Sequence, residues 1–94
     1  MTKVLVVDDT PDMAKLMARA VQDQGYEAIV AGDGPHALEM ASAERPDVVL
    51  LDIMMPRMNG IEVLRRLKAD AQLREIPVIL VSAKSEDRDV IEGL

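Results

Sequence analysis

Three short runs of aliphatic residues recur along the chain, at Val4–Val7, Val48–Leu51 and Val78–Val81. Each run holds four consecutive apolar residues, rich in β-branched side chains, and each ends directly before a polar residue. Because these runs show no alternation of apolar and polar positions, they indicate strands covered on both faces, as in a parallel sheet. A weaker, half-polar segment, Glu27–Ala31, predicts a further strand at an edge of the same sheet.

The segments between the runs carry apolar residues at helical spacing. One helix is predicted between Thr10, its N-cap, and Gly25, its left-handed stop. A second is predicted from Asp33 and ends before Pro46, and a third begins after Asn59, which forms a capping box with the glutamate three residues later. The residues expected to face the core are Met13, Leu16, Met17, Ala20 and Val21 in the first helix, Ala37, Met40 and Ala41 in the second, and Ile61, Leu64 and Leu67 in the third.

The alternation of strands and helices defines the fold class. A chain of this order predicts an α/β fold, in which a parallel sheet carries helices on both faces through right-handed crossovers. The 94 residues make one domain, residues 1–94. A fourth helix is predicted from Ser85, but its apolar stripe has only begun at Leu94, so we expect the domain to be incomplete at its C-terminus.

The composition narrows the classes of function. Hydrophobic residues make up 49% and charged residues 30%, a globular balance. The net charge of −6 argues against nucleic-acid binding, which depends on lysine and arginine. The absence of cysteine and the presence of a single histidine exclude thiolate and histidine-rich metal sites. No apolar run is long enough to cross a membrane and no signal peptide is visible, so we infer a soluble, cytoplasmic protein without membrane contacts.

Polar residues stand at the carboxyl ends of three predicted strands. Asp8 and Asp9 follow the first run, Asp52 follows the second and Ser82 follows the third. In a parallel sheet these ends share one edge, where ligands bind. A single aspartate there is often only a turn former or a helix cap. Three carboxylates at equivalent positions repel one another unless they hold a cation, and oxygen ligands of this kind favour Mg²⁺ or Mn²⁺.

One carboxylate of such a site can act as a nucleophile. Aspartate accepts a phosphoryl group as an acyl phosphate, while a metal ion neutralises charge between the carboxylate and the phosphoryl oxygens. Asp52 is the natural acceptor because it stands alone on its strand, which leaves Asp8 and Asp9 to hold the metal. The hydroxyl of Ser82 is placed to donate a hydrogen bond to a phosphoryl oxygen.

Three segments resemble the receiver domain of two-component response regulators: VLVVDD at 4–9, VVLLDIMMPRMNGIEVLRRLK at 48–68 and IPVILVSAK at 76–84. The resemblance covers essentially the whole chain, and the central segment is its most specific part. It implies a flavodoxin-like parallel sheet with strand order 2-1-3-4-5. The family's fifth strand, the lysine at its end and the following helix are missing from this chain, so we expect the order 2-1-3-4.

The resemblance also implies a role for each matching residue around the metal. Asp52 matches the phosphoacceptor. Asp9 matches the direct carboxylate ligand of Mg²⁺, and Asp8 matches the carboxylate that acts largely through water. Met54 matches the position whose backbone carbonyl binds the metal, so the identity of its side chain matters little there. Asp52 would serve both as acceptor and as metal ligand.

The function implied by the resemblance is a phosphorylation-controlled signalling switch. Ser82 matches the hydroxyl residue that turns toward the phosphate, and Ala83 matches the small residue that leaves room for entry to the site. A sensor histidine kinase or a phosphotransfer protein would supply the phosphoryl group, and the region from Ser82 to Leu94 would change conformation. Such a domain is not an enzyme, beyond weak self-phosphorylation and self-dephosphorylation.

Two other interpretations remain open at this point. A phosphatase similar to haloacid dehalogenases also uses Mg²⁺ and an aspartate after a strand, but it needs a second aspartate two residues later, where Thr10 follows Asp8. The other alternative is a receiver-like interaction module that is never phosphorylated. Because the fifth strand of the receiver family is missing, the apolar run Val78–Val81 would leave an open strand edge, through which we expect two copies to associate or to exchange an element.

Overall fold

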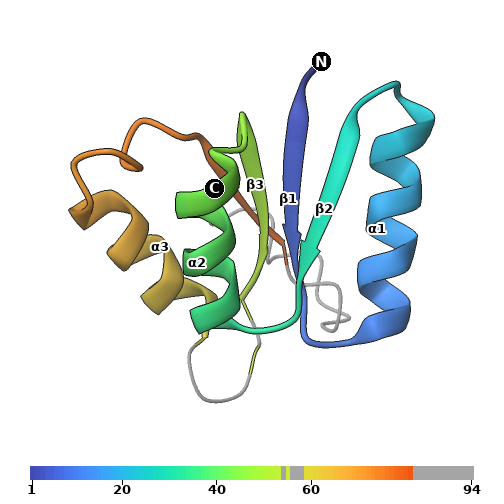
Figure 1. The fold of residues 1–94 in the computed structure, drawn as a ribbon. Coiled ribbons are helices and arrows are strands. Elements are labelled where there is room, and N and C mark those ends of the chain that lie inside the picture. Colours follow the sequence, from blue (N-terminus) through green and yellow to red (C-terminus); the bar gives the residue numbers. More distant parts are fainter. Residues whose placement is uncertain (54, 56–58, 82–94) are drawn as a thin grey trace.

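The computed structural model of the chain describes residues 1–53, 55 and 59–81 (Figure 1). Strands and helices alternate along these residues. The strands are β1 (Lys3–Val7), β2 (Glu27–Ala31), β3 (Val48–Asp52) and β4 (Val78–Val81), and the helices are α1 (Pro11–Asp23), α2 (Gly34–Glu44) and α3 (Gly60–Ala69). None of these described helices is long and apolar enough to cross a membrane. The helix expected from Ser85 lies outside the described residues.

The described strands form one sheet in the order β2-β1-β3-β4. Every neighbouring pair is parallel: Val4 is in register with Ala28 of β2 and Val48 of β3, and Leu50 is in register with Ile79 of β4. Figure 1 shows α1 on one face of the sheet and α2 with α3 on the other. The flavodoxin-like α/β fold and the order 2-1-3-4 are therefore confirmed, and all four strands have their carboxyl ends at one edge.

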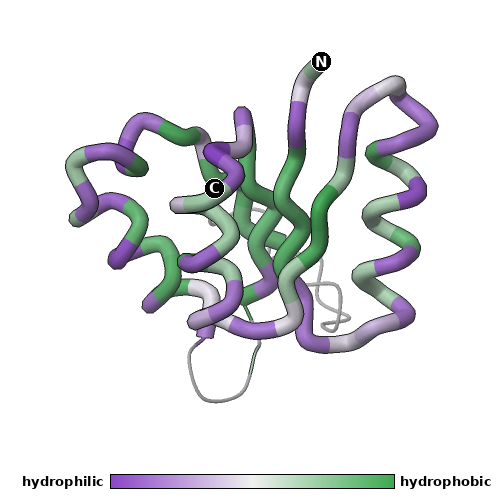
Figure 2. The backbone as a smooth tube through the Cα atoms, viewed as in Figure 1, coloured by the Kyte–Doolittle hydropathy of each residue, from purple (hydrophilic) through white to green (hydrophobic). Residues whose placement is uncertain are grey.

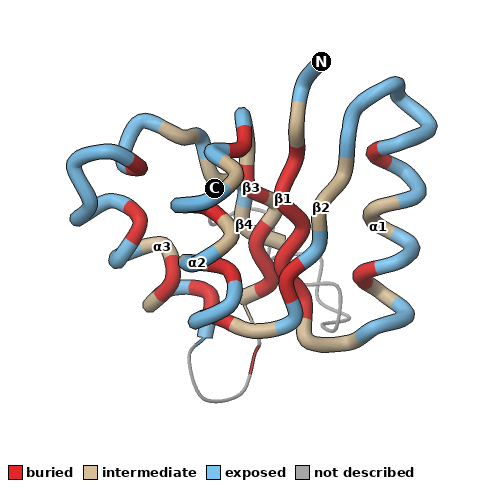
Figure 3. The backbone as a smooth tube through the Cα atoms, viewed as in Figure 1, coloured by how far each residue is buried: buried red, intermediate tan, exposed pale blue. Residues whose placement is uncertain are grey.

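The two faces of the sheet are buried to different extents, and the apolar, buried positions concentrate on the strands (Figures 2 and 3). On the face under α1, a small cluster contains Val4, Val6 and Val21. The face under α2 and α3 carries the main core, because alternate strand residues there meet two helices. Its members are Leu5, Val7, Ala31, Ala37, Ala41, Val49, Leu51, Met55, Val63, Leu67 and Leu73.

The helix ends follow local chemistry that is visible in the sequence. Asp33 Oδ1 accepts a hydrogen bond of 2.8 Å from the backbone N–H of His36, and Asn59 Oδ1 accepts one of 3.0 Å from Glu62. Gly25, after α1, has φ +90°, as the left-handed stop requires. The capping box is only half formed, because the carboxylate of Glu62 pairs with arginines of its own helix instead of reaching back.

Three residues that were expected to face the core are exposed, and those predictions were wrong. Leu16 is 62% exposed, Ile61 is 45% exposed, and Ala20 is also exposed. In α1 the buried residues are Ala14 and Val21, and in α3 they are Gly60, Val63 and Leu67. Ala14 and Gly60 let their helices lie close to the sheet, which turns the stripe that contains them inward.

Candidate functional site

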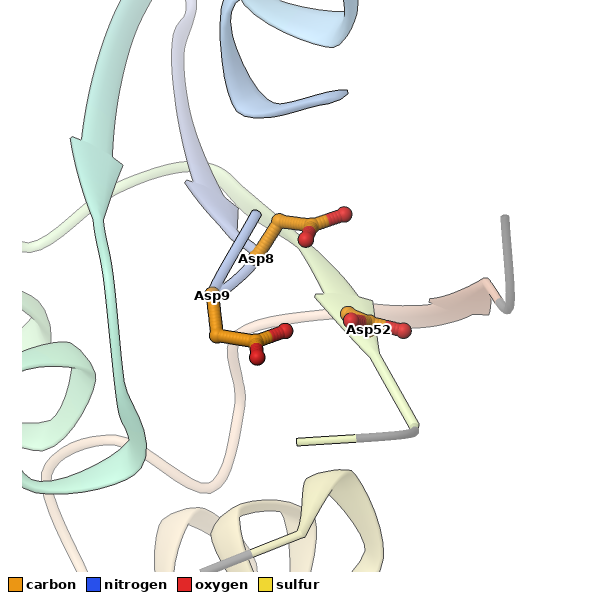
Figure 4. Close-up of side chains that lie close together, drawn as sticks. All are labelled: Asp8, Asp9 and Asp52. Carbon is orange, nitrogen blue, oxygen red and sulfur yellow. The ribbon is translucent and has the colours of Figure 1, made fainter. Parts of the chain in front are cut away.

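Three aspartates meet at the carboxyl edge of the sheet (Figure 4). Asp8 and Asp9 directly follow β1, and Asp52 is the last residue of β3. One carboxylate oxygen from each residue lies within 4.8 Å of the other two. These residues, called the aspartate cluster below, come together because β1 and β3 are parallel neighbours, with Val7 in register with Leu51. The structure thus brings together the three carboxylates that the strand ends predicted.

Two members of the aspartate cluster are almost completely buried. Asp8 is 2% exposed and Asp52 is 1% exposed, whereas Asp9 is partly exposed. Asp8 Oδ1 accepts a hydrogen bond of 2.8 Å from the backbone N–H of Thr10. Asp8 Oδ2 is buried and has no hydrogen-bond partner among the described residues. A buried carboxylate oxygen without a partner is costly, so this atom is suited to a cation or a bound water.

Thr10 contributes to the site in a way that the sequence interpretation missed. It is the N-cap of α1 by position, but its side chain makes no capping hydrogen bond. Its backbone N–H instead fixes one oxygen of Asp8. An aspartate that accepts from the residue two positions later forms an Asx turn, and this pattern is visible in the sequence at Asp8 and Thr10.

The backbone around Asp52 is held from two sides. Ile53 donates its N–H to the carbonyl oxygen of Val81 at 2.9 Å, which ties the end of β3 to the end of β4. The carbonyl oxygen of Ile53 accepts hydrogen bonds from Gly60 at 2.9 Å and from Met55 at 3.2 Å. The position of Asp52 therefore depends on β4 and on the first residue of α3 as well as on its own strand.

Three of the sequence-predicted site residues, Met54, Ser82 and Ala83, lie outside the described residues, and their roles stay predictions. Val81, the last residue of β4, is in register with Asp52. The described part of the site therefore consists of the aspartate cluster and the backbone that supports it.

The chain belongs to the response regulator receiver family, since residues 4–94 match the response regulator receiver domain. It is 42% identical over 92 residues to the DNA-binding response regulator MtrA of Mycolicibacterium smegmatis. That match covers 98% of this chain and 39% of MtrA, so the chain spans about two fifths of the length of this relative. Receiver domains are phosphorylation-controlled signalling switches and not enzymes in themselves.

Solved structures agree with this assignment. The N-terminal domain of a response regulator receiver protein from Methanoculleus marisnigri JR1 has a TM-score of 0.86 and 39% identity, covering 99% of this chain and 76% of that one. The receiver domain of the sensor histidine kinase PA1611 from Pseudomonas aeruginosa PAO1, solved with a magnesium ion coordinated in its active site cleft, has a TM-score of 0.83 and 26% identity, covering 95% of this chain and 73% of that one. The comparisons give no support to a phosphatase or to an unphosphorylated interaction module.

Proposed function

We propose that Asp52 accepts a phosphoryl group and that this domain is a Mg²⁺-dependent phosphorylation switch. The observation that carries this proposal is the juxtaposition of Asp52 with Asp8 and Asp9, whose ligand oxygens lie within 4.8 Å of one another. Asp52 ends an interior strand of the sheet and is buried, so its carboxylate is held in a fixed direction. The strand order thus presents one nucleophilic oxygen beside two further carboxylates at a ligand-binding edge.

The residues of the aspartate cluster fit a hard divalent cation. All the side-chain donors are carboxylate oxygens, and the buried Oδ2 atom of Asp8 faces no hydrogen-bond donor among the described residues. Asp9 would bind Mg²⁺ directly, Asp8 largely through water, and Met54 through its backbone carbonyl, with Mn²⁺ as a substitute. When bound, the ion would neutralise the charge that builds up between Asp52 and the phosphoryl oxygens.

The proposed switch runs from Asp52 to the segment after β4. A phosphoryl group adds negative charge at Asp52, and the hydroxyl of Ser82 would donate to it while Ala83 leaves the entrance open. The hydrogen bond from Ile53 to Val81 supports this route, because it joins the acceptor strand to the residue that precedes Ser82. The donor would be a sensor histidine kinase or a phosphotransfer protein acting in the cytoplasm.

Intact-mass spectrometry after incubation with acetyl phosphate and Mg²⁺ tests the proposal. The wild-type chain should gain one phosphoryl group, and Asp52→Asn should gain none while keeping the fold. Asp47→Asn, which neutralises an aspartate at the opposite end of the sheet, is the matched control and should be phosphorylated like the wild type. Persistent mass addition in Asp52→Asn would contradict the assignment. A folded wild type that is never modified would favour an interaction module, and multiple turnover of a phosphate ester would favour a phosphatase.

A second proposal concerns the outer edge of β4, where a second copy of this chain would bind. Among the described strands, β4 pairs only with β3, and Ile79 on it is 44% exposed. Ile79 also lines an apolar groove beside α1, together with Met17 and Leu50. A strand edge that no described strand covers, beside an apolar surface, favours pairing with an identical strand. Light scattering should show a dimer that Ile79→Lys weakens, and a monomer at high concentration would contradict it.

A further inference from the structure

Gly60 packs against the backbone of the proposed phosphoacceptor. It is the buried first residue of α3, and its N–H donates to the carbonyl oxygen of Ile53 at 2.9 Å. A Cβ atom on Gly60 would lie 2.7 Å from Ile53 Cα, 3.0 Å from the carbonyl carbon of Asp52, and closer still to the carbonyl oxygen of Asp52. Real side chains do not approach backbone atoms this closely, so a larger residue forces something to move.

The atoms that a side chain at Gly60 would meet cannot rotate out of the way, because all three belong to the backbone. Ile53 is tied to Val81 of β4, and α3 is fixed in the core by the fully buried Val63 and by Leu67. The displacement would therefore fall on the junction between Asp52 and Ile53 or on the start of α3. The first shift moves the Asp52 carboxylate directly, and the second strains the hydrogen bond from Gly60 to Ile53 that holds the backbone next to Asp52.

We propose that Gly60 is a positioning residue for Asp52: its missing side chain sets the close approach of α3 to β3 and thereby holds the Asp52 carboxylate beside Asp8 and Asp9. This inference rests on the proposed role of Asp52 as acceptor. Its expected effect is large, because a displacement of about 1 Å at a reacting group slows a reaction by about 100-fold.

The need for glycine here is steric and not conformational. The φ angle of Gly60 lies outside the left-handed region, so alanine can adopt the same backbone. Alanine is also the better helix former at the start of α3, which opposes the loss caused by crowding. Gly32 is a matched control, because it too has an ordinary φ angle and a Cβ atom there would meet nothing within 4 Å.

The test compares Gly60→Ala, Gly32→Ala and Val63→Ala in the full chain. Val63→Ala weakens the packing of the same helix without placing an atom against Asp52. Phosphorylation by acetyl phosphate at saturating Mg²⁺ is followed by mass spectrometry, Mg²⁺ affinity by calorimetry and the thermal midpoint by circular dichroism. Gly60→Ala should slow phosphorylation ~10- to 100-fold at a temperature where it is folded, whereas Gly32→Ala should stay within ~2-fold of the wild type and Val63→Ala should lose stability but little rate.

Two results would overturn the positioning role. One is a folded Gly60→Ala that is phosphorylated at the wild-type rate and binds Mg²⁺ with wild-type affinity. The other is a Val63→Ala that loses as much rate as Gly60→Ala at an equal loss of thermal midpoint. If Gly60→Ala unfolds, the assay is repeated in trimethylamine N-oxide, which favours the compact state; a chain still unfolded there makes Gly60 a folding determinant and also overturns the proposal.

A failure of the proposed function gives a different pattern. If the wild type itself is never phosphorylated, Asp52 is not the acceptor, yet the Mg²⁺ affinities of Gly60→Ala and Gly32→Ala still differ when Gly60 positions the Asp52 carboxylate. Equal affinities in those two variants would contradict the positioning role independently of phosphorylation.

Discussion

The two ends of the sheet differ in what their acidic side chains are placed against. At the amino end, the backbone N–H of Lys3 donates to Asp47 Oδ2 at 2.8 Å, and Lys3 Nζ lies 3.0 Å from Glu44 Oε1. At the carboxyl end, the aspartate cluster gathers three carboxylates within 4.8 Å of one another. The acids at the first end are matched to a cation of the chain and stabilise the fold. The acids at the second end face one another. Their mutual repulsion lowers the stability of the fold but suits the binding of a cation.

The pKa of Lys3 reflects the acidic side chains that surround it at the amino end of the sheet. The hydrogen bond to Glu44 raises this pKa above its ordinary value of 10.5, burial opposes that effect, and attraction to Glu44, Glu27 and Asp47 adds to it. The charged form of Lys3 is therefore favoured by folding, and the acids around it contribute to stability at neutral pH.

The largest predicted effect on stability in this comparison is stabilisation of the fold by Mg²⁺. A ligand at 100 times its dissociation constant stabilises a protein by about 2.7 kcal/mol, which for a domain of this size raises the thermal midpoint by more than ~10 °C. Asp9→Asn should lose most of this rise, whereas Asp47→Asn should keep it. Thermal unfolding with and without Mg²⁺ measures both, and an equal rise in the two variants would place the ion elsewhere.

Neutralising one acid of the aspartate cluster should stabilise the metal-free protein. Asp52→Asn keeps the shape of the side chain and removes one of three neighbouring charges, and we expect a gain of about 1–2 kcal/mol in the free energy of unfolding. Urea unfolding in the presence of a chelator provides the measurement. Asp47→Asn should move the other way, because it weakens the acceptor of the Lys3 N–H. A loss of stability in Asp52→Asn would mean that repulsion does not dominate at the carboxyl end.

Removing the cation at the amino end should cost stability that depends on pH. Lys3→Met leaves Glu44 without its ion pair and should lower stability at neutral pH. Because folding raises the pKa of Lys3, the wild-type advantage is fully present below 10.5 and is lost as the pH rises through the higher pKa of the folded state. Urea unfolding at about pH 8 and about pH 11.5 should show the gap between wild type and variant closing. A gap that stays constant would assign the effect to packing of the lysine stem.

The smallest predicted effect is the dependence of stability on ionic strength. Screening reduces repulsion within the aspartate cluster only partly, since two of its carboxylates are buried. Raising the ionic strength in the absence of divalent ions should therefore narrow the stability gap between wild type and Asp52→Asn by about 0.5 kcal/mol or less. The same measurements on Lys3→Met are the control. Screening weakens the attraction between Lys3 and Glu44, so the wild type should lose stability relative to Lys3→Met as the ionic strength rises. A widening gap for Asp52→Asn would contradict the repulsion argument.

The strands and the aspartate cluster could be predicted from the sequence because they depend on local runs and on one topological rule. Continuous aliphatic runs mark β1, β3 and β4, and parallel strands bring Asp8, Asp9 and Asp52 to one edge once they pair. The strand order itself came from the family resemblance, since the runs alone do not specify which strands are neighbours.

The features that could not be predicted from the sequence depend on how closely the helices approach the sheet. The exposure of Leu16 and Ile61 follows from how closely α1 and α3 approach the sheet, and several apolar stripes on a helix are compatible with the same spacing. The contact of Gly60 with Asp52 has the same origin. Arg45, at the end of α2, has φ +48° without the glycine or asparagine that usually marks such a turn, so the sequence carried no signal for it.

The pairing of β1 with β3 means that the aspartate cluster can form only once the chain extends through β3. A polypeptide that ends before β3 has Asp8 and Asp9 but lacks the third carboxylate and the neighbouring strand that buries Asp8. The proposed divalent-ion affinity would therefore report the long-range pairing of β1 with β3, and a titration of Mg²⁺ during refolding would time that pairing.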